Sequence, residues 1–192
     1  MFYRFARAVC RAVLAVLRRW RVHGAENLPA AGGMVVVSNH LSYWDPVVVG
    51  CALKRQVYFM AKAELFAIPL LGPVIRALGA FPVRRQTTDR QAVKTALHLL
   101  ARGELVGIFP EGTRSHSGEL LKPHVGAAVL AYKAGVPVLP VALKGTRGVL
   151  GRVEVFIGEP FALRFASKPA KRDLEEASDE VMKKIAGLLG SK

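Results

Sequence analysis

A histidine and an aspartate stand five positions apart in the stretch SNHLSYWDP, residues 38–46. The four intervening residues can fold back so that the Asp45 carboxylate reaches one imidazole nitrogen of His40. Such a carboxylate fixes the tautomer of the ring and stabilises the charge that develops when the other nitrogen takes a proton. The spacing therefore predicts a base that activates a hydroxyl group. Asp45 followed by Pro46 also fits the start of a helix, with Asp45 as the N-cap, and both interpretations stay open.

A second stretch, IFPEGTRS at residues 108–115, places an acid, a glycine and a base in one turn after an apolar run. Arg114 can bind a phosphate through two parallel N–H bonds, and Glu111 can hold the hydroxyl groups of a ligand. Gly112 allows a ligand to approach the backbone closely, and Thr113 lies between them. An ordinary surface turn uses the same residue types, so this stretch alone does not decide between the two interpretations.

A third candidate is the pair Arg84 and Arg85 at the end of GAFPVRR. Adjacent side chains on a strand alternate between faces, so only one of the two can point into a given pocket. Two solvated arginines at a strand end are the alternative. The sequence has no G-x-S-x-G elbow and neither cysteine has an obvious base, so the nucleophile is expected to be a hydroxyl of the substrate.

The composition favours anionic partners. The chain has 192 residues, 52% of them hydrophobic, and a formal net charge of +14. This charge suits nucleic acid, a membrane surface or a phosphorylated substrate, and does not choose among them. Cys10 and Cys51 lack metal-ligand spacing and the density of a disulfide scaffold, so we expect a reducing, cytosol-facing compartment and no metal.

Residues 1–22 carry six arginines and no acid, and helical spacing puts the arginines opposite an apolar face with aromatic residues near both ends. This pattern predicts a helix that lies in the interface of an anionic membrane, where each arginine adds about 1 kcal/mol. The alternatives are a helix packed on its own domain with solvated arginines, and an organellar presequence. No uncharged apolar run reaches the length of a transmembrane helix.

Short β-branched runs alternate with helical patterns along the rest of the chain. This order predicts an α/β fold, a three-layer α/β/α domain with a mixed, largely parallel central sheet, preceded by the amphipathic helix. The expected division is residues 1–24 for the membrane-interface helix and 25–192 for the catalytic domain. His40 then follows the carboxyl end of a strand, where open α/β sheets bind their ligands.

Taken together and in this order, these stretches resemble the lysophosphatidate acyltransferase family, from about Met34 to Thr146. The motif N-H-x-S-x-x-D is matched by Asn39, His40, Ser42 and Asp45, and F-P-E-G-T-R-S is matched in full from Phe109 to Ser115. In the family motif G-x-F-x-x-D-R, Arg85 falls on the phosphate-binding arginine and Arg84 replaces the usual aspartate. The apolar stretch VPVLPVAL resembles the fourth motif.

The resemblance implies a mechanism. His40 takes the proton of the acceptor hydroxyl, Asp45 orients His40, and the alkoxide attacks the thioester of acyl-CoA or acyl carrier protein without an acyl-enzyme. Arg114 and Arg85 would hold the acceptor phosphate, Glu111 the glycerol portion, and backbone N–H groups near Gly112 the phosphate or the oxyanion. Thr113 belongs to the same substrate-binding turn. No cofactor other than the thioester co-substrate is implied.

We therefore expect an enzyme that acylates the sn-2 hydroxyl of lysophosphatidate to give phosphatidate. The alternative acceptors are glycerol-3-phosphate, a lyso-ornithine lipid and a lysophospholipid, and a basic binding protein without catalysis is a distant alternative. We expect a peripheral or monotopic protein on the cytoplasmic face of the inner membrane. Nucleic acid is not an expected partner, because no recognition module is present. The helix at residues 1–21 and the segment 66–78 are both candidate membrane anchors.

Overall fold

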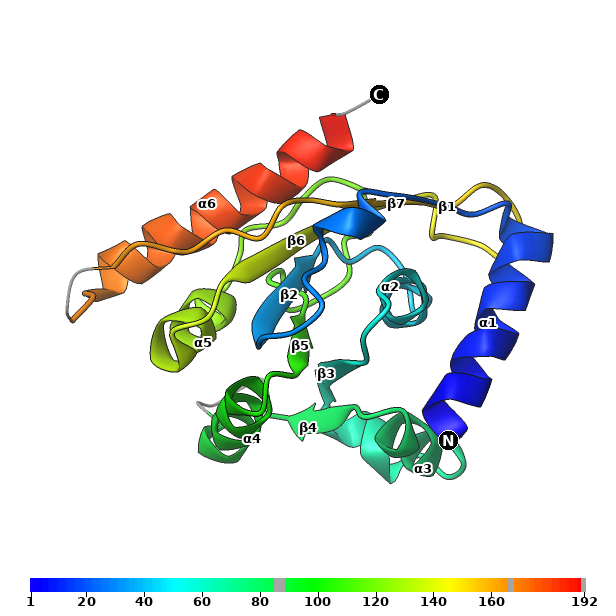
Figure 1. Cartoon of the computed structure of the whole chain (residues 1–192), viewed down its shortest axis with the longest axis horizontal. Coiled ribbons are helices and arrows are strands. Elements are labelled where there is room, and N and C mark those ends of the chain that lie inside the picture. Colours follow the sequence, from blue (N-terminus) through cyan, green and yellow to red (C-terminus); the bar gives the residue numbers. More distant parts are fainter. Residues whose placement is uncertain (85–88, 166–167, 191–192) are drawn as a thin grey trace.

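The structure, a computed structural model, describes residues 1–84, 89–165 and 168–190 (Figure 1). In chain order the elements are α1 (Phe2–Arg18), β1 (Arg21–His23), the 3₁₀ turn η1 (Ala25–Asn27), β2 (Met34–Ser38), α2 (Asp45–Ala52), β3 (Val57–Lys62), the 3₁₀ turn η2 (Ala63–Ala67), α3 (Leu71–Ala77), β4 (Phe81–Val83), α4 (Arg90–Ala101), β5 (Leu105–Ile108), α5 (Gly126–Ala134), β6 (Val138–Lys144), β7 (Glu154–Ile157) and α6 (Lys171–Gly190).

The strands form one seven-stranded sheet in the order β1-β7-β6-β2-β5-β3-β4. Neighbouring strands are parallel except for the antiparallel pair β6 and β7. Helices cover both faces, with α1 and α2 on one side and α4, α5 and α6 on the other (Figure 1). The predicted fold class, a largely parallel sheet in an α/β domain, is confirmed.

The central strand β2 shows why the sequence gives this architecture. All five of its residues are buried, as expected for a strand that is covered on both faces. Its side chains alternate, so Met34 and Val36 pack in the α1–α2 layer while Val35 and Val37 pack in the layer of α4, α5 and α6. His40 follows the carboxyl end of β2 and lies at the end of the sheet where the parallel strands finish.

The first helix is shorter than the sequence pattern predicts. Helix α1 ends at Arg18, and Arg19 takes a left-handed conformation with φ of 39°. Residues Arg21–His23 then form β1, which pairs in parallel with β7 at the edge of the sheet. The expected helix over residues 1–22 is wrong in its last turn, because β7 offers free backbone groups that β1 can pair with. The division of the chain at residue 24 stays a prediction.

Helix α1 packs on its own domain and also uses arginines to do so. Arg7 and Arg11 point toward the domain and donate to carbonyl oxygens at the C-terminal end of α2, with Arg11 Nη1 2.8 Å from the Cys51 oxygen and Arg7 Nη1 3.2 Å from the Lys54 oxygen. These carbonyls lack partners within their own helix, so arginine donors stabilise them. Leu14 and Arg18 are buried, and the apolar side of α1 is left facing outward.

Candidate active site

His40 and Asp45 form the predicted pair. The imidazole Nδ1 lies 2.7 Å from Asp45 Oδ2, and the same oxygen accepts backbone N–H bonds from Leu41 at 2.5 Å and Ser42 at 2.7 Å. Asp45 is fully buried, whereas 12% of the His40 side chain is exposed. Because a carboxylate only accepts hydrogen bonds, Nδ1 carries the proton and Nε2 is left as the basic nitrogen.

The helix-cap interpretation of Asp45 is wrong. Asp45 is the first residue of α2 rather than its N-cap, which is Trp44, and no side chain caps the helix. Its carboxylate turns back toward the 40–42 loop instead of toward the first turn of α2. The geometry therefore assigns the carboxylate to His40 and to the loop that holds it, because those are the donors it faces.

A stack of aromatic rings fixes the plane of the imidazole. The His40 ring lies on Phe109 with centroids 4.0 Å apart and planes 16° apart. Phe59 on β3 stacks behind Phe109 at 5.7 Å. Offset ring contacts of this kind contribute about 0.5–1.5 kcal/mol and restrict rotation of the ring. The sequence alone did not indicate that Phe109 contacts His40. Its place at the start of the FPEGTRS motif marked it only as a residue near the site.

Glu111 holds the backbone of the catalytic loop. Its Oε1 accepts the His40 N–H at 2.7 Å and its Oε2 accepts the Leu121 N–H at 2.9 Å. Only 3% of Glu111 is exposed, and this burial raises the pKa of its carboxyl group. Each carboxylate oxygen thus accepts one backbone N–H bond, and Glu111 positions the loop that carries His40. The predicted contact of Glu111 with glycerol hydroxyls stays a prediction.

The other backbone group of His40 is held by the same turn. Ser115 N–H donates to the His40 carbonyl at 2.8 Å. Gly112 needs its glycine, because it has φ of +67° and a Cβ there would lie 2.7 Å from the ring of His124. The two motifs, some seventy residues apart in the chain, are thus bound to each other through the backbone of His40.

Arg114 lies against the His40–Asp45 loop. Its Nη2 donates to the Tyr43 hydroxyl at 3.0 Å, and its guanidinium carbon lies 3.7 Å from the centroid of the Tyr43 ring. This stack brings a cation from the FPEGTRS turn next to the loop that carries the base. Thr113 beside it is exposed. Sequence reasoning missed Tyr43, one of the variable positions of the N-H-x-S-x-x-D motif.

Of the two arginines after β4, the structure describes only Arg84. Arg84 is exposed, and its backbone N–H donates to Asp89 Oδ2 at 3.0 Å, just before α4 begins. Arg85 lies outside the described residues, so its predicted contact with phosphate stays a prediction. Over residues 1–84, 89–165 and 168–190, no group of three or more metal-ligating side chains comes together.

Two further residues connect the site to its surroundings. Asn39 is buried, and its side-chain amide bonds both backbone groups of Leu143, accepting at 2.8 Å and donating at 3.0 Å, so it fixes the 39–40 segment to β6. Arg147 donates from Nη2 to the Ser115 carbonyl at 2.7 Å. Sequence reasoning assigned neither contact, because each joins segments that are distant in the chain.

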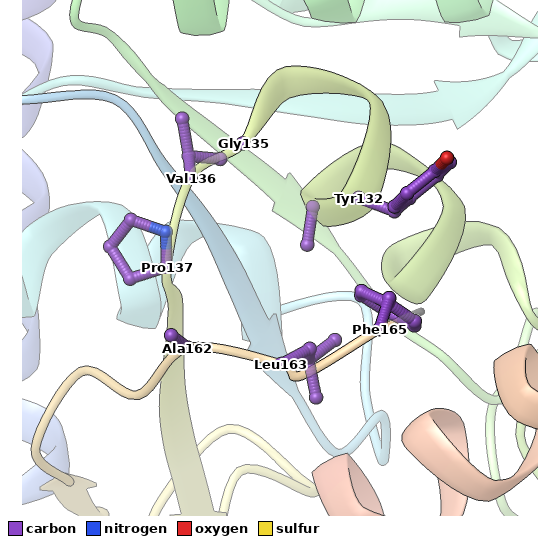
Figure 2. A pocket seen from close by; sticks show the side chains of 8 residues that line it. Tyr132, Gly135, Val136, Pro137, Ala162, Leu163 and Phe165 are labelled. Atoms are coloured by element: carbon purple, nitrogen blue, oxygen red, sulfur yellow. The ribbon is translucent and has the colours of Figure 1, made fainter. Parts of the chain in front are cut away.

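A separate apolar pocket of about 420 Å³ lies between α5, the start of β6 and residues 162–165 (Figure 2). Val138 begins β6, and Ser38 ends the parallel strand β2. This pocket therefore lies at the amino ends of the strands, whereas His40 lies at their carboxyl ends. Its lining is Ala131, Tyr132, Gly135, Val136, Pro137, Ala162, Leu163 and Phe165. With no acid or base on its walls, it is not the catalytic site.

The site combines a histidine held by a buried carboxylate with a neighbouring arginine, at the carboxyl ends of parallel strands. This arrangement is typical of an enzyme that activates a hydroxyl group for group transfer. The comparisons agree. The sequence profile of the family described as Acyltransferase matches residues 19–144. The chain is 33% identical over 193 residues to the 1-acyl-sn-glycerol-3-phosphate acyltransferase of Bacillus subtilis, covering 97% of this chain and 96% of that protein.

The corresponding protein of Streptococcus pneumoniae is 31% identical over 200 residues, covering 97% of this chain and 69% of that protein. The crystal structure of the 1-acyl-sn-glycerophosphate acyltransferase PlsC from Thermotoga maritima superimposes with a TM-score of 0.76 at 27% identity, covering 99% of this chain and 82% of that one. The chain belongs to the Acyltransferase family and is an acyltransferase enzyme.

Proposed function

We propose that this enzyme transfers a fatty acyl group from an acyl thioester to the sn-2 hydroxyl of 1-acylglycerol-3-phosphate, giving phosphatidate. The observation that carries the proposal is the 2.7 Å contact between His40 Nδ1 and Asp45 Oδ2, which leaves Nε2 as a base at the carboxyl edge of the sheet. The relatives named above supply the acceptor, because their names specify 1-acyl-sn-glycerol-3-phosphate. The thioester donor is acyl-CoA or acyl carrier protein.

The reaction follows from the geometry of the pair. His40 Nε2 takes the proton of the acceptor hydroxyl as the oxygen attacks the thioester carbonyl carbon. Asp45 stabilises the imidazolium through the Nδ1–H bond. The carbon–sulfur bond then breaks, and the sulfur takes the proton from His40, so the donor leaves as a thiol. General base assistance of this kind contributes about 10²–10⁴ in rate.

Direct transfer needs no nucleophile from the protein. Cys51 lies near the end of α2 opposite Asp45, it is buried, and burial raises the pKa of its thiol to about 11. A thiol with such a pKa is almost entirely protonated near neutral pH and is a poor nucleophile. These features support a ternary complex of enzyme, thioester and acceptor.

Arg114 supplies the phosphate contact in this proposal. Arg114→Ala is expected to raise KM for lysophosphatidate about 10- to 100-fold with little change in kcat, since a charge-assisted contact to the non-reacting phosphate contributes mainly to binding. Initial rates with lysophosphatidate and with monoacylglycerol, which lacks the phosphate, would measure this. The variant should handle monoacylglycerol as the wild type does. An equal loss with both acceptors would contradict the phosphate contact.

The acceptor itself is tested on the wild-type enzyme in lipid micelles with labelled acyl-CoA. Glycerol-3-phosphate, a lyso-ornithine lipid, a lysophospholipid and lysophosphatidate would be supplied in turn. We expect the highest kcat/KM with lysophosphatidate. Equal or faster acylation of one of the others would assign the enzyme to that acceptor instead. Repeating the assay with acyl carrier protein as donor identifies the thioester.

We further propose that the enzyme is a peripheral or monotopic membrane protein at the cytoplasmic face of the inner membrane. None of the helices in the described part of the chain combines the length and apolar character of a bilayer-spanning segment. Helix α1 turns Phe2, Phe5, Val9 and Val16 outward, and all four are exposed. An exposed apolar helix face on a protein of charge +14 suits an anionic lipid surface.

Point changes test this surface better than removal of residues 1–21, because a truncation would also remove the buried Leu14 and Arg18. Changing Phe5, Val9 and Val16 together to serine is expected to release the folded protein from anionic liposomes in flotation. The matched variant changes Leu70 and Val74 together to serine, because both are exposed residues of the alternative anchor at 66–78. If the α1 variant floats as the wild type and the 70/74 variant does not, that segment is the anchor.

A further inference from the structure

The loop between β6 and β7 exposes two adjacent apolar side chains. Val149 is 66% exposed and Leu150 is 71% exposed. Gly148 and Gly151 flank them with φ of +75° and +114°, so the backbone makes a tight tip that a side chain at those positions would strain. Nothing in the catalytic site as described uses this tip.

The base of this loop is fixed to α1 by a buried arginine. Only 2% of Arg18 is exposed, and its guanidinium donates to the carbonyl oxygens of Gly145 at 2.5 Å and Gly148 at 2.7 Å. The backbone adds to this connection, because Val153 N–H donates to the Arg18 carbonyl at 3.0 Å. A buried cation is costly unless such bonds satisfy it, so the loop and the end of α1 are held together.

This connection places the tip beside the outer face of α1. Figure 1 shows the loop next to the C-terminal turn of α1, the helix whose exposed apolar residues include Val16 and Leu17. The surrounding cations are exposed, and they come from both segments: Arg19, Arg21, Arg147 and Arg152. Exposed apolar side chains with exposed arginines nearby in the same segments match an anionic bilayer surface, in which acyl chains lie beneath a layer of phosphates.

We propose that the loop at residues 148–151 is a second membrane-inserting segment, in which Val149 and Leu150 enter the interface of an anionic bilayer next to α1. This proposal rests on the membrane association proposed above. The two segments contact lipid as one rigid unit, because Arg18 joins them. Insertion at two points fixes the orientation of the enzyme on the membrane, because contact along α1 alone would leave the whole molecule able to tilt about the line of that helix.

The loop also connects this lipid contact to the catalytic turn. Arg147 precedes the tip, and its side chain donates to the Ser115 carbonyl, while Ser115 N–H holds the His40 carbonyl. A lipid acceptor has to leave the bilayer and bring its hydroxyl to His40. The bonds through Arg147 and Ser115 hold the lipid-contacting loop and the loop that carries His40 in a fixed relation to each other.

The test introduces tryptophan at the tip of the full-length chain. Leu150→Trp is compared with Ala170→Trp, a charge-neutral control at an exposed position directly before α6. Figure 1 shows the N-terminal end of α6 on the far side of the molecule from α1. Emission is recorded with vesicles of phosphatidylcholine and phosphatidylglycerol, and the wild-type signal of Trp20 and Trp44 is subtracted. We expect a blue shift and quenching by lipids brominated in the acyl chains for Leu150→Trp and neither effect for Ala170→Trp.

A second variant measures the effect on binding. Changing Val149 and Leu150 together to serine is expected to weaken partitioning into the same vesicles about ten-fold, while acylation of a short-chain, micelle-free acceptor is unchanged. Unchanged Leu150→Trp emission on vesicles that retain the protein in flotation would overturn the loop proposal and leave α1 as the anchor. A blue shift that depends on protein concentration without vesicles would indicate self-association and would also overturn it. Failure of the proposed reaction would appear separately, as absence of acyl transfer to any acceptor.

Discussion

Replacing His40 by alanine is expected to lower kcat by about 10²–10⁴ while the protein still folds. The variant loses Nε2, the base that takes the acceptor proton, but it keeps the backbone bonds from His40 to Glu111 and Ser115. The structural cost comes from the lost ring stack on Phe109 and from the lost Nδ1–H bond to the buried Asp45, together about 1–3 kcal/mol, while Asp45 Oδ2 keeps its bonds from Leu41 N and Ser42 N. The measurement is acyl transfer to lysophosphatidate at saturating substrate, together with thermal unfolding by circular dichroism.

The matched control is His98→Ala, which removes an exposed histidine on α4. This control should keep both turnover and stability, because it contacts neither motif of the site. A folded His40→Ala protein with substantial turnover would overturn the assignment of His40 as the base. Turnover no higher than that of a preparation without enzyme, in the wild type and in both variants, would instead favour the alternative of a basic membrane-binding protein.

Replacing Asp45 by asparagine is the second change with a large expected effect. The neutral amide cannot stabilise the imidazolium as a carboxylate does. Its oxygen can take the place of Asp45 Oδ2, which accepts from His40 Nδ1, Leu41 N and Ser42 N, and its NH₂ group then takes the place of Oδ1, which is buried without a partner among the described residues. We expect kcat to fall by about 10²–10⁴. Stability should also fall, by about 1–3 kcal/mol, because the new NH₂ group is buried without an acceptor. Kinetics and denaturant unfolding on the same preparation separate the two effects.

The control for Asp45 is Asp173→Asn on α6. Asp173 also accepts a backbone bond, from Ala170 N–H at 2.8 Å, but it lies at an exposed helix start. Its change should cost a few tenths of a kcal/mol to about 1 kcal/mol and leave kcat unaltered. If Asp45→Asn behaved like this control, with stability lowered and kcat intact, the carboxylate would be structural and would not orient the base.

Helix α1 shows where sequence reasoning succeeded and where it stopped. Its helical period and its opposed apolar and arginine faces were visible in the sequence. Which face turns inward was not. The expectation of arginines directed to lipid or solvent was wrong for the buried Arg18, and Arg7 and Arg11 also bond carbonyl oxygens of the domain. The end of α2 and the 145–148 loop present carbonyl oxygens that need donors, and only the folded chain brings those oxygens to the helix.

Glu111 likewise makes contacts that the sequence did not reveal. Its position in the FPEGTRS motif indicated a functional residue, and the resemblance indicated a contact with substrate. The structure buries its carboxylate between the His40 and Leu121 backbones. A motif indicates that an acid is needed at a position, but the bonds from that acid to the His40 and Leu121 backbones become visible only in the folded chain.

The sequence by itself determined the α/β class, the order of most elements, the family, and the partnership of His40 with Asp45. These follow from periodicity and from residues a few positions apart, whose geometry is set by the local chain. Only the tertiary structure decided the stack of His40 on Phe109, the stack of Arg114 on Tyr43, and the attachment of the 145–152 loop to Arg18. Each of these contacts joins segments that are distant in sequence, and the packing of the sheet, not the local pattern, brings them within reach.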